Sequence, residues 1–358
     1  MNELDQLQIF GEILTPNDSK IQKVYNKRAV PLVNGKQVSF SSAIKHIKKI
    51  ISNNNIHFSG LSCDLKTIDR VIQISERKRF SLSHINQNEI SNFYSAFYKF
   101  GCSSISINEM KNRADTIIIL GEMSRPLQKV LIKYLKNINK ILSRNVYFIS
   151  SKKKSNFKNH TYKNDLYGFI NGLNDLDSLK KDPIVEKLLA SKYPVCLIAD
   201  TEDFLFTQLI FQALMNINNK KDNLKVLKLN GTNNSGGYVN SCTIKSGFPG
   251  PLNFSDWGIS FNPHEFSTSE IIKRKNIQFS ISNFSEKQSF LEFKYNILIG
   301  NPNSIKQEFY DVFIPTKTPG VDCDGLVLRS DGVKVIKLKG NLNSDYFDNS
   351  QILEQVFS

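Results

Sequence analysis

The side chains that could carry out chemistry are few and dispersed in this sequence. The five histidines, at positions 46, 57, 84, 160 and 264, stand in separate segments, and no His-x-His or His-Glu-x-x-His pair occurs. The five cysteines, at 63, 102, 196, 242 and 323, include no Cys-x-x-Cys pair. A zinc centre needs convergent Cys, His or carboxylate ligands, and an iron–sulfur cluster needs grouped thiolates. The sequence therefore predicts no metal site.

Three loops combine glycine with polar residues at or just beyond the ends of predicted strands. They are residues 59–64 (Ser-Gly-Leu-Ser-Cys-Asp), 120–126 (Leu-Gly-Glu-Met-Ser-Arg-Pro) and 320–325 (Gly-Val-Asp-Cys-Asp-Gly). Asp64 is expected to cap the helix that follows the first loop, and Arg125 stands near the helix start after the second, where an anion can bind. Because ligands of parallel α/β sheets sit at the carboxyl ends of strands, we expect these loops to share one crevice.

Asp322 and Asp324 are the one closely spaced pair of carboxylates with a possible chemical role. At i and i+2 in an extended segment both side chains point the same way, which suits an oxygen-ligated cation. A solvated bend of the same composition is the favoured alternative. No Gly-x-Gly-x-x-Gly after a strand, no P-loop and no Gly-x-Ser-x-Gly elbow occurs, so the dinucleotide-binding and serine-hydrolase signatures are absent.

The elements that would position these loops alternate between strands and helices. This order predicts an α/β fold with a largely parallel sheet. Runs of β-branched residues predict strands at residues 56–60, 79–83, 115–120, 145–149, 194–199, 224–229, 276–282, 295–299 and 311–314. Amphipathic patterns predict helices at 64–75, 126–142, 183–191 and 204–216, and one opening at 40–44 with Ser41 or Ser42 as its cap.

Other stretches lack such a pattern. Residues 231–251 are rich in glycine and contain two prolines, which predicts a long irregular loop. The basic stretch 151–156 is either an anion-binding loop or, as we favour, a solvated linker. The residues after 340 are expected to form a polar surface tail that ends in a short amphipathic turn.

The net charge is strongly positive, because 47 Lys and Arg residues face 33 Asp and Glu residues in a chain of 358, giving +14. Such an excess favours an acidic partner, or it reflects a lysine-rich composition. The N-terminus shows no signal peptide, and the apolar runs are too short to cross a bilayer. The scattered, odd number of cysteines is typical of a reducing compartment. We therefore expect a cytoplasmic protein without membrane contact.

Four segments, in the same order, resemble the B-type subunit family of formylmethanofuran dehydrogenase. Together they span roughly residues 28–340. They are Val-Asn-Gly-Lys-Gln-Val-Ser-Phe-Ser-Ser-Ala-Ile within 31–44, Glu-Met-Lys-Asn-Arg-Ala-Asp within 108–121, Asn-Gly-Thr-Asn-Asn-Ser-Gly at 230–236 with Thr-Ile-Lys-Ser-Gly-Phe-Pro at 243–249, and Ile-Pro-Thr-Lys-Thr-Pro-Gly-Val-Asp-Cys-Asp-Gly within 313–325 with Arg-Ser-Asp-Gly-Val at 329–333.

The chain departs from that family where the family binds its cofactors. The dehydrogenase holds a [4Fe–4S] centre with an N-terminal cysteine cluster, but no cysteine precedes Cys63 here. Its molybdenum or tungsten ligand is a cysteine, whereas the corresponding region from His84 to Ser91 has no thiol. Without that thiolate the metal loses its protein ligand. We therefore expect neither a Mo/W-pterin nor a [4Fe–4S] cluster on this chain.

With these departures, the chain resembles one branch of the family, the formyltransferase/hydrolase complex of methylotrophic bacteria. The resemblance implies a structural B-type subunit that works with other subunits, which transfer and hydrolyse the formyl group. It implies two α/β domains with parallel sheets, of the formate dehydrogenase/DMSO reductase type. Residues 1–40 would form an N-terminal segment without an iron–sulfur cluster. Residues 41–150 and 285–358 would together form the first domain, and residues 151–284 would form a second domain inserted into it. The positive charge could retain a polyglutamylated methanofuran-type carrier. A vestigial cofactor crevice would comprise Ser59, Ser62, Gly121, Arg125, Asn234, Gly236, Gly320 and Gly325.

Two other functions remain open. An active formylmethanofuran dehydrogenase, a molybdopterin oxidoreductase, would need a thiolate or another metal ligand. A nucleic-acid-binding protein would show arginines interleaved with aromatic residues. The positive charge here consists mostly of scattered lysines, so we expect no nucleic-acid partner.

Overall fold

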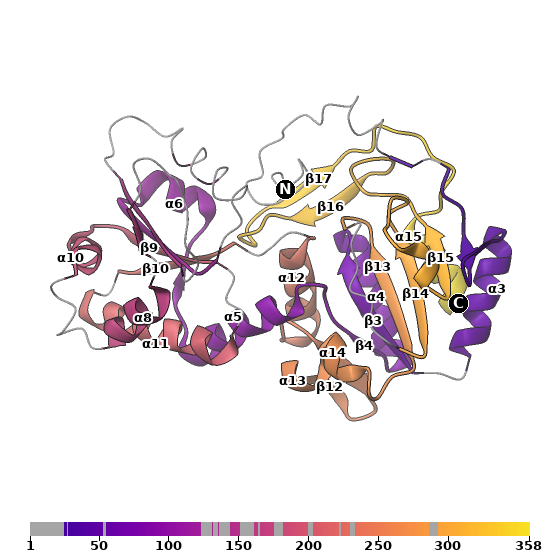
Figure 1. Cartoon of the computed structure of the whole chain (residues 1–358), viewed down its shortest axis with the longest axis horizontal. Coiled ribbons are helices and arrows are strands. Elements are labelled where there is room, and N and C mark those ends of the chain that lie inside the picture. The colour runs from indigo at the N-terminus through magenta and orange to yellow at the C-terminus, as the bar shows by residue number, and fades with distance from the viewer. Residues whose placement is uncertain are drawn as a thin grey trace. The chain divides into compact units, whose positions relative to one another are not determined.

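The computed structural model divides into two compact units (Figure 1). It describes residues 25–358 apart from 27, 53–54, 123–143 (where only 131 and 135 are placed), 151–160, 164, 175–181, 200–202, 222, 230–232 and 286–292. The first unit is Ser91–Asn230, and the second is built from both sides of it, Asn2–Ile90 and Gly231–Ser358. The chain enters the first unit within α5 (Gln87–Phe100).

The first unit is built on a parallel sheet of six strands. Its order is β5-β10-β9-β6-β7-β8, and every pair is parallel. The strands are β5 (Ser103–Ser104), β6 (Thr116–Leu120), β7 (Asn145–Ile149), β8 (Thr161–Lys163), β9 (Pro194–Ile198) and β10 (Lys225–Lys228). The described helices, besides most of α5, are α6 (Ile107–Arg113), α8 (Leu166–Asn174), α10 (Pro183–Ala190) and α11 (Phe204–Lys221).

The Lys-Asn-Arg-Ala-Asp segment has a structural role in this unit. Ser106 caps α6, and Glu109 on that helix accepts hydrogen bonds from Arg113 and from the Tyr193 hydroxyl. Asp115 enters β6 and accepts hydrogen bonds from the backbone of Lys192 and Tyr193 at 2.7 and 3.0 Å. The segment thereby fixes the starts of the neighbouring strands β6 and β9.

The second unit contains a mixed sheet of nine strands. Its order is β12-β11-β4-β3-β13-β14-β15-β1-β2, in which β4 to β15 are parallel and both margins are antiparallel. These strands are β1 (Leu32–Val33), β2 (Lys36–Gln37), β3 (Ile56–Ser62), β4 (Ser81–Leu82), β11 (Leu252–Ser255), β12 (Gly258–Phe261), β13 (Ile277–Ser282), β14 (Tyr295–Gly300) and β15 (Val312–Pro315). A separate hairpin joins β16 (Gly325–Leu328) to β17 (Val335–Leu338).

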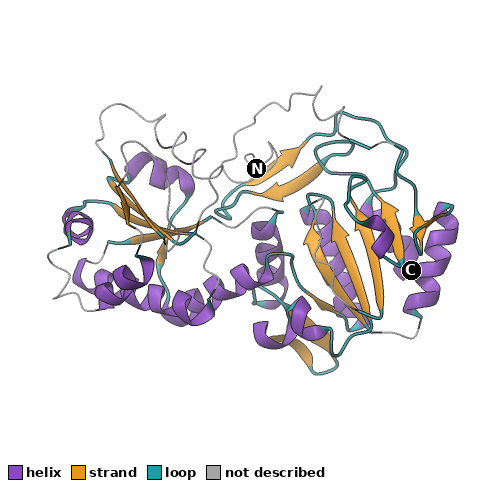
Figure 2. Cartoon of the chain, in the orientation of Figure 1, coloured by secondary structure: helices purple, strands orange, loops and turns teal. Residues whose placement is uncertain are grey.

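Helices pack beside this sheet (Figure 2). The longer ones are α3 (Phe40–Ile51), α4 (Leu65–Lys78), α12 (Ser235–Ser246) and α15 (Asn349–Phe357), and α13 (Pro263–Phe266), α14 (Thr268–Ile271) and a 3-10 turn at Gln307–Phe309 are short. The rings of Phe58, Phe279 and Phe357 lie 5.4–5.7 Å apart. They pack the C-terminal helix onto the two central strands, and such an aromatic cluster buries much apolar surface.

The neighbouring residues on β3 carry polar side chains inside the sheet. His57 is fully buried and hydrogen-bonds Ser81 and Ser83 through its two ring nitrogens, both at 2.9 Å. Burial lowers the pKa of His57 to about 3, so the ring is neutral. Ser59 is bonded to Ser280 at 2.7 Å and to Gln278 at 2.9 Å.

The α/β class with two sheets rich in parallel strands is confirmed, and the predicted strands exist with small shifts of their ends. The unit boundaries fall at 90/91 and 230/231 rather than at 151 and 284, because β5, β6 and β7 share one sheet with β9 and β10. The predicted helix at 126–142 and the basic stretch 151–156 lie outside the described residues, save 131 and 135.

Two predictions about irregular segments are wrong. Residues 231–251 are not one long loop, because α12 forms within them and buries Tyr238, Val239 and Cys242. The burial of that face offsets the weak helix propensity of Gly236 and Gly237. The residues after 340 are not only a surface tail, since α15 buries four apolar side chains, Ile352, Leu353, Val356 and Phe357.

In the described part of the chain, no helix combines the length and the hydropathy that a bilayer span requires.

Candidate functional site

The carboxyl ends of the parallel strands in the second unit are the place where this fold class binds ligands. The residues that follow β3, β4, β13, β14 and β15 gather there because these strands are neighbours in the sheet. They include Cys63 and Asp64 after β3, His84 after β4 and Asn283 after β13. Side-chain amides and hydroxyls dominate, and many of them bond the backbone of a neighbouring loop.

Asn233 and Asn234 connect three of these loops. Both have left-handed backbone angles, with φ of 65° and 57°, which asparagine tolerates better than most residues. The Asn234 side chain donates to the Cys63 carbonyl at 2.9 Å and accepts the Leu328 N–H at 2.9 Å. Ser62 donates to the Asn233 side chain at 3.0 Å. The pair thus holds the end of β3, the start of α12 and the β16–β17 hairpin together.

His84 is a buried member of the same cluster. Its Nε2 lies 3.1 Å from the Asn233 carbonyl and its Nδ1 accepts the Asn86 N–H at 3.0 Å. A carbonyl oxygen can only accept a hydrogen bond, so the Nε2 that faces it must carry the proton, and these partners fix the Nε2–H tautomer. Burial lowers the pKa of His84 to about 4, and the hydrogen bond to Asn233 opposes that shift. Both ring nitrogens are occupied by protein groups, so His84 is placed as a structural link.

Asn283 forms a second connection at this edge. Its side-chain amide donates to Thr316 Oγ1 at 2.9 Å and to the Lys317 carbonyl at 2.8 Å, and it accepts a hydrogen bond from Asn349 at 2.5 Å. It is fully buried. Asn283 therefore connects β13, the loop after β15 and the start of α15. Asn283 was not among the predicted site residues, although its position directly after the predicted strand 276–282 could have indicated a residue of the carboxyl edge.

Asp322 and Asp324 do not converge on a common point. The buried Asp322 accepts hydrogen bonds from the Thr318 N–H at 2.6 Å, the Tyr25 hydroxyl at 2.7 Å and the Ser344 hydroxyl at 2.5 Å. Asp324 is exposed and bonds the Gly340 N–H and the Lys339 ammonium, at 3.0 and 3.1 Å. Asp322 thus joins the turn to Tyr25 and Ser344, whereas Asp324 bonds the neighbouring chain at 339–340. The favoured solvated bend describes the exposed Asp324 but not the buried Asp322.

The eight residues predicted for a cofactor crevice have different environments. Ser62, Asn234 and Gly325 belong to the cluster at the carboxyl edge. At Gly325 an added Cβ would lie 2.5 Å from Pro319 Cβ and 3.5 Å from Asp64 Cβ. Gly236 lies in the first turn of α12, and Gly320 donates its N–H to the Cys323 carbonyl in the following turn.

Of the other three predicted residues, the structure describes Ser59 and Gly121. Ser59 is inside β3, because that strand continues to Ser62 through a bulge at Gly60 and Leu61. Gly121 ends β6 in the first unit and has a φ of 99°. Arg125 lies outside the described residues.

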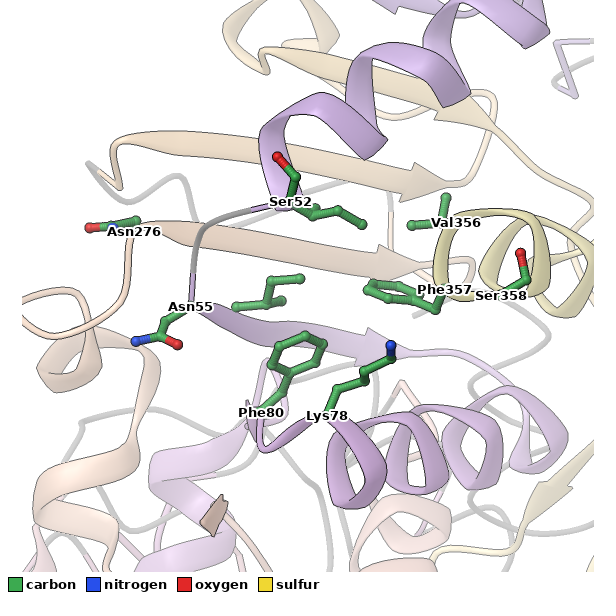
Figure 3. A pocket seen from close by; sticks show the side chains of 10 residues that line it. Ser52, Asn55, Lys78, Phe80, Asn276, Val356, Phe357 and Ser358 are labelled. Carbon is green, nitrogen blue, oxygen red and sulfur yellow. The ribbon is translucent and has the colours of Figure 1, made fainter. Parts of the chain in front are cut away.

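A pocket of about 510 Å³ opens at the opposite, amino edge of the second unit's sheet. Phe80 and Phe357 lie toward its middle, while Ser52, Asn55 and Asn276 stand around it (Figure 3). Three helices, α3, α4 and α15, end beside it, so carbonyl groups face this region. Lys78 is the one titratable side chain of its lining. The pocket offers a surface for binding but no acid–base pair.

None of the five cysteines offers a ready thiolate. All are free, and burial raises the pKa of each thiol, to about 12 for Cys102 and Cys323 and further for Cys63. Among the described residues, no group of three His, Cys, Asp or Glu side chains is arranged to hold a metal ion.

Comparison with solved structures places this architecture among known folds. No protein-family model and no curated protein matches the chain. The chain is similar to a chain in the crystal structure of the formyltransferase/hydrolase complex from Methylorubrum extorquens in complex with methylofuran. The TM-score is 0.77 at 15% identity, covering 92% of this chain and 98% of that one. It is also similar to acetylene hydratase from Pelobacter acetylenicus, with a TM-score of 0.56 at 8% identity over 95% and 62% of the two chains. At such low identities, the TM-scores show a similar fold and nothing further.

The two carboxylates of the 320–325 turn should differ sharply when substituted. Asp322→Asn presents an N–H₂ where hydroxyl and N–H donors now point, so the free energy of unfolding should fall by about 1–3 kcal/mol. Asp324→Asn, on a fully exposed side chain, should leave it nearly unchanged. Urea unfolding of both variants measures the difference. Equal effects would contradict the structural assignment of Asp322.

Buried His84 should make the protein acid-sensitive. Its folded pKa of about 4 lies below the ordinary value of 6.5. The unfolded chain therefore binds a proton that the folded chain refuses, and stability present above pH 6.5 is lost as the pH falls toward 4. Unfolding free energies between pH 7 and 4.5 should decline less steeply in His84→Gln than in the parent. Identical slopes in the two proteins would rule out this burial effect.

Proposed function

We propose that this chain is the non-catalytic, B-type structural subunit of a formyltransferase/hydrolase complex. Such a complex moves a formyl group from a tetrahydromethanopterin carrier to a methanofuran-type carrier and releases formate. The observation that carries the proposal is the match in fold over nearly the whole of both chains, with a TM-score of 0.77.

The four motifs in shared order are further support, because the structure gives three of them specific tasks. Asp115 in the second motif holds the turn at residues 192–193. Asn234 in the third joins the end of β3 to the β16–β17 hairpin. Asp322 in the fourth holds Tyr25 and Ser344. Motifs with structural tasks are what a scaffold that lost its cofactor is expected to retain.

The absence of catalytic machinery in this chain is supported by the chemistry of the carboxyl edge. Hydrolysis of a formamide requires an activated water, from a metal hydroxide or a tuned general base. Among the described histidines, the buried His57 and His84 bond protein groups through both ring nitrogens. Asp322 is likewise engaged by three protein donors. We assign transfer and hydrolysis to partner subunits.

The positive charge suits a role in retaining a polyanionic carrier. Lys45, Lys48 and Lys49 are exposed on α3, and the chain as a whole carries +14. Charge of this kind attracts a polyglutamylated methanofuran-type carrier by long-range steering rather than by specific contacts.

Assembly and activity measurements test the proposal. The purified chain alone should neither transfer nor hydrolyse formyl groups, and it should contain no stoichiometric Mo, W or Fe. Expressed together with the formyltransferase and hydrolase subunits, it should join a complex that releases formate, and Asp324→Asn should leave that turnover unchanged. Stoichiometric Mo or W on the purified chain would favour the alternative of an active formylmethanofuran dehydrogenase. Formate release by the isolated chain would contradict the non-catalytic role.

Carrier retention should be sensitive to salt. Raising the ionic strength shortens the Debye length to about 3 Å at 1 M, so affinity for a polyglutamylated carrier should fall with salt. Lys45→Gln/Lys48→Gln/Lys49→Gln should weaken binding at low salt and reduce that dependence, while affinity for a carrier without the glutamyl tail should stay the same. A salt-independent affinity would contradict a role for the net charge.

A further inference from the structure

β12 is the edge strand on one side of the nine-stranded sheet, and no described strand pairs with its outer side. We call this outer side of β12 the open margin. The Phe254 N–H donates to the Phe80 carbonyl, so Phe254 faces the β4 side and its neighbours Asn253 and Ser255 face β12. Their partners in the hairpin are Ser260 and Gly258. The backbone groups of Ile259 and Phe261 must then point outward, because successive residues of a strand alternate. No described residue hydrogen-bonds to them on that side.

This margin is short, at four residues, but it lacks the lysine, proline and bulge that often protect an edge strand. β12 reads Gly-Ile-Ser-Phe, and it is paired in regular register with β11 over all four of its residues. The strand is therefore free to pair with another strand.

Apolar side chains lie beside the open margin. Trp257, the single tryptophan of the chain, occupies the hairpin turn and is 100% exposed. The Phe261 ring stacks on Phe248, with centroids 5.3 Å apart. Phe248 is 39% exposed, and Ile244, one helical turn earlier, is 73% exposed. A fully exposed tryptophan beside further apolar surface is the usual composition of an interaction hot spot.

We propose that this margin pairs with the same margin of a second copy of the chain. An antiparallel pairing with a two-fold axis beside Ser260 places Ile259 of each copy opposite Phe261 of the other. Each such pair exchanges two hydrogen bonds. In this one register, the outward N–H and carbonyl groups of one copy are therefore all bonded to those of the other copy. The same register directs Trp257 toward the residues that follow β12 in the second copy.

The charges around the hairpin permit this pairing. Arg79 bonds Asp256 at 2.9 Å, Arg274 bonds Glu265, and Lys273 lies 3.7 Å from Glu270. Each ion pair is neutral within one copy, so no uncompensated charge is brought against its like. The remaining net charge is screened beyond about 8 Å at physiological ionic strength. The self-complementary margin and its locally neutral flanks favour a second copy over a strongly charged partner.

Sedimentation velocity of the full chain over a range of concentrations tests the proposal. The parent protein should form a dimer that persists at high salt, because backbone and apolar contacts hold it. Trp257→Ala, which alters only a fully exposed side chain, should weaken the dimer at least tenfold. Ile259→Pro, which removes an outward N–H, should abolish it.

A matched control lies at the other margin of the same sheet. Gln37 on β2 also faces outward, because its neighbour Val38 donates its N–H to the Pro31 carbonyl within the β1–β2 hairpin. Gln37→Pro should leave the dimer intact. Emission of the single tryptophan should shift to the blue as the parent dimer forms.

A parent protein that stays monomeric at every concentration would overturn the proposal. This holds also if the margin instead binds a different protein. So would a dimer that survives both Trp257→Ala and Ile259→Pro. Circular dichroism verifies folding of each variant, and Trp257→Ala decides the matter if Ile259→Pro fails to fold. The outcome is independent of the proposed function.

Discussion

The backbone groups at the carboxyl ends of five parallel strands must be hydrogen-bonded, and this chain satisfies many of them with its own asparagines. A buried N–H or carbonyl without a partner costs about as much as a lost hydrogen bond. Asn234 bonds the Cys63 carbonyl and the Leu328 N–H, and Asn283 bonds the Lys317 carbonyl. In related folds this edge accepts a ligand. Here the asparagine side chains that line this edge form hydrogen bonds with other protein groups.

Such hydrogen bonds explain why segments far apart in sequence are fixed together. The Asn349–Asn283 hydrogen bond attaches the C-terminal helix, and the Tyr25–Asp322 bond attaches residues near the N-terminus. The cluster of Phe58, Phe279 and Phe357 supplies apolar burial behind the same strands. Contacts between protein groups thereby join the two parts of the chain that make up the second unit.

Sequence patterns predicted the buried parallel strands well, missed the short strands such as β5 and β12, and predicted the edge only in part. Strand 145–149 was predicted to the residue, since β-branched and aromatic residues there form one uninterrupted run. The helix at Ser235–Ser246 was missed, because its glycines signal a loop while the burial that stabilises it is tertiary. Ser59 was assigned to a loop because Gly60 resembles a strand end, but the chain bulges and continues to Ser62. Long-range partners, such as Tyr25 for Asp322, leave no local pattern to read.

Hydrogen exchange on the assembled complex, with and without a methanofuran-type carrier, tests most directly whether the carboxyl edge is a scaffold. The measured segments are those containing Cys63, Asn234, Asn283 and Leu328. If their side chains and backbone are committed to one another, their amides should be strongly protected and should not respond to the carrier. Carrier-dependent protection of these segments would show that the edge is a ligand site and would contradict the account.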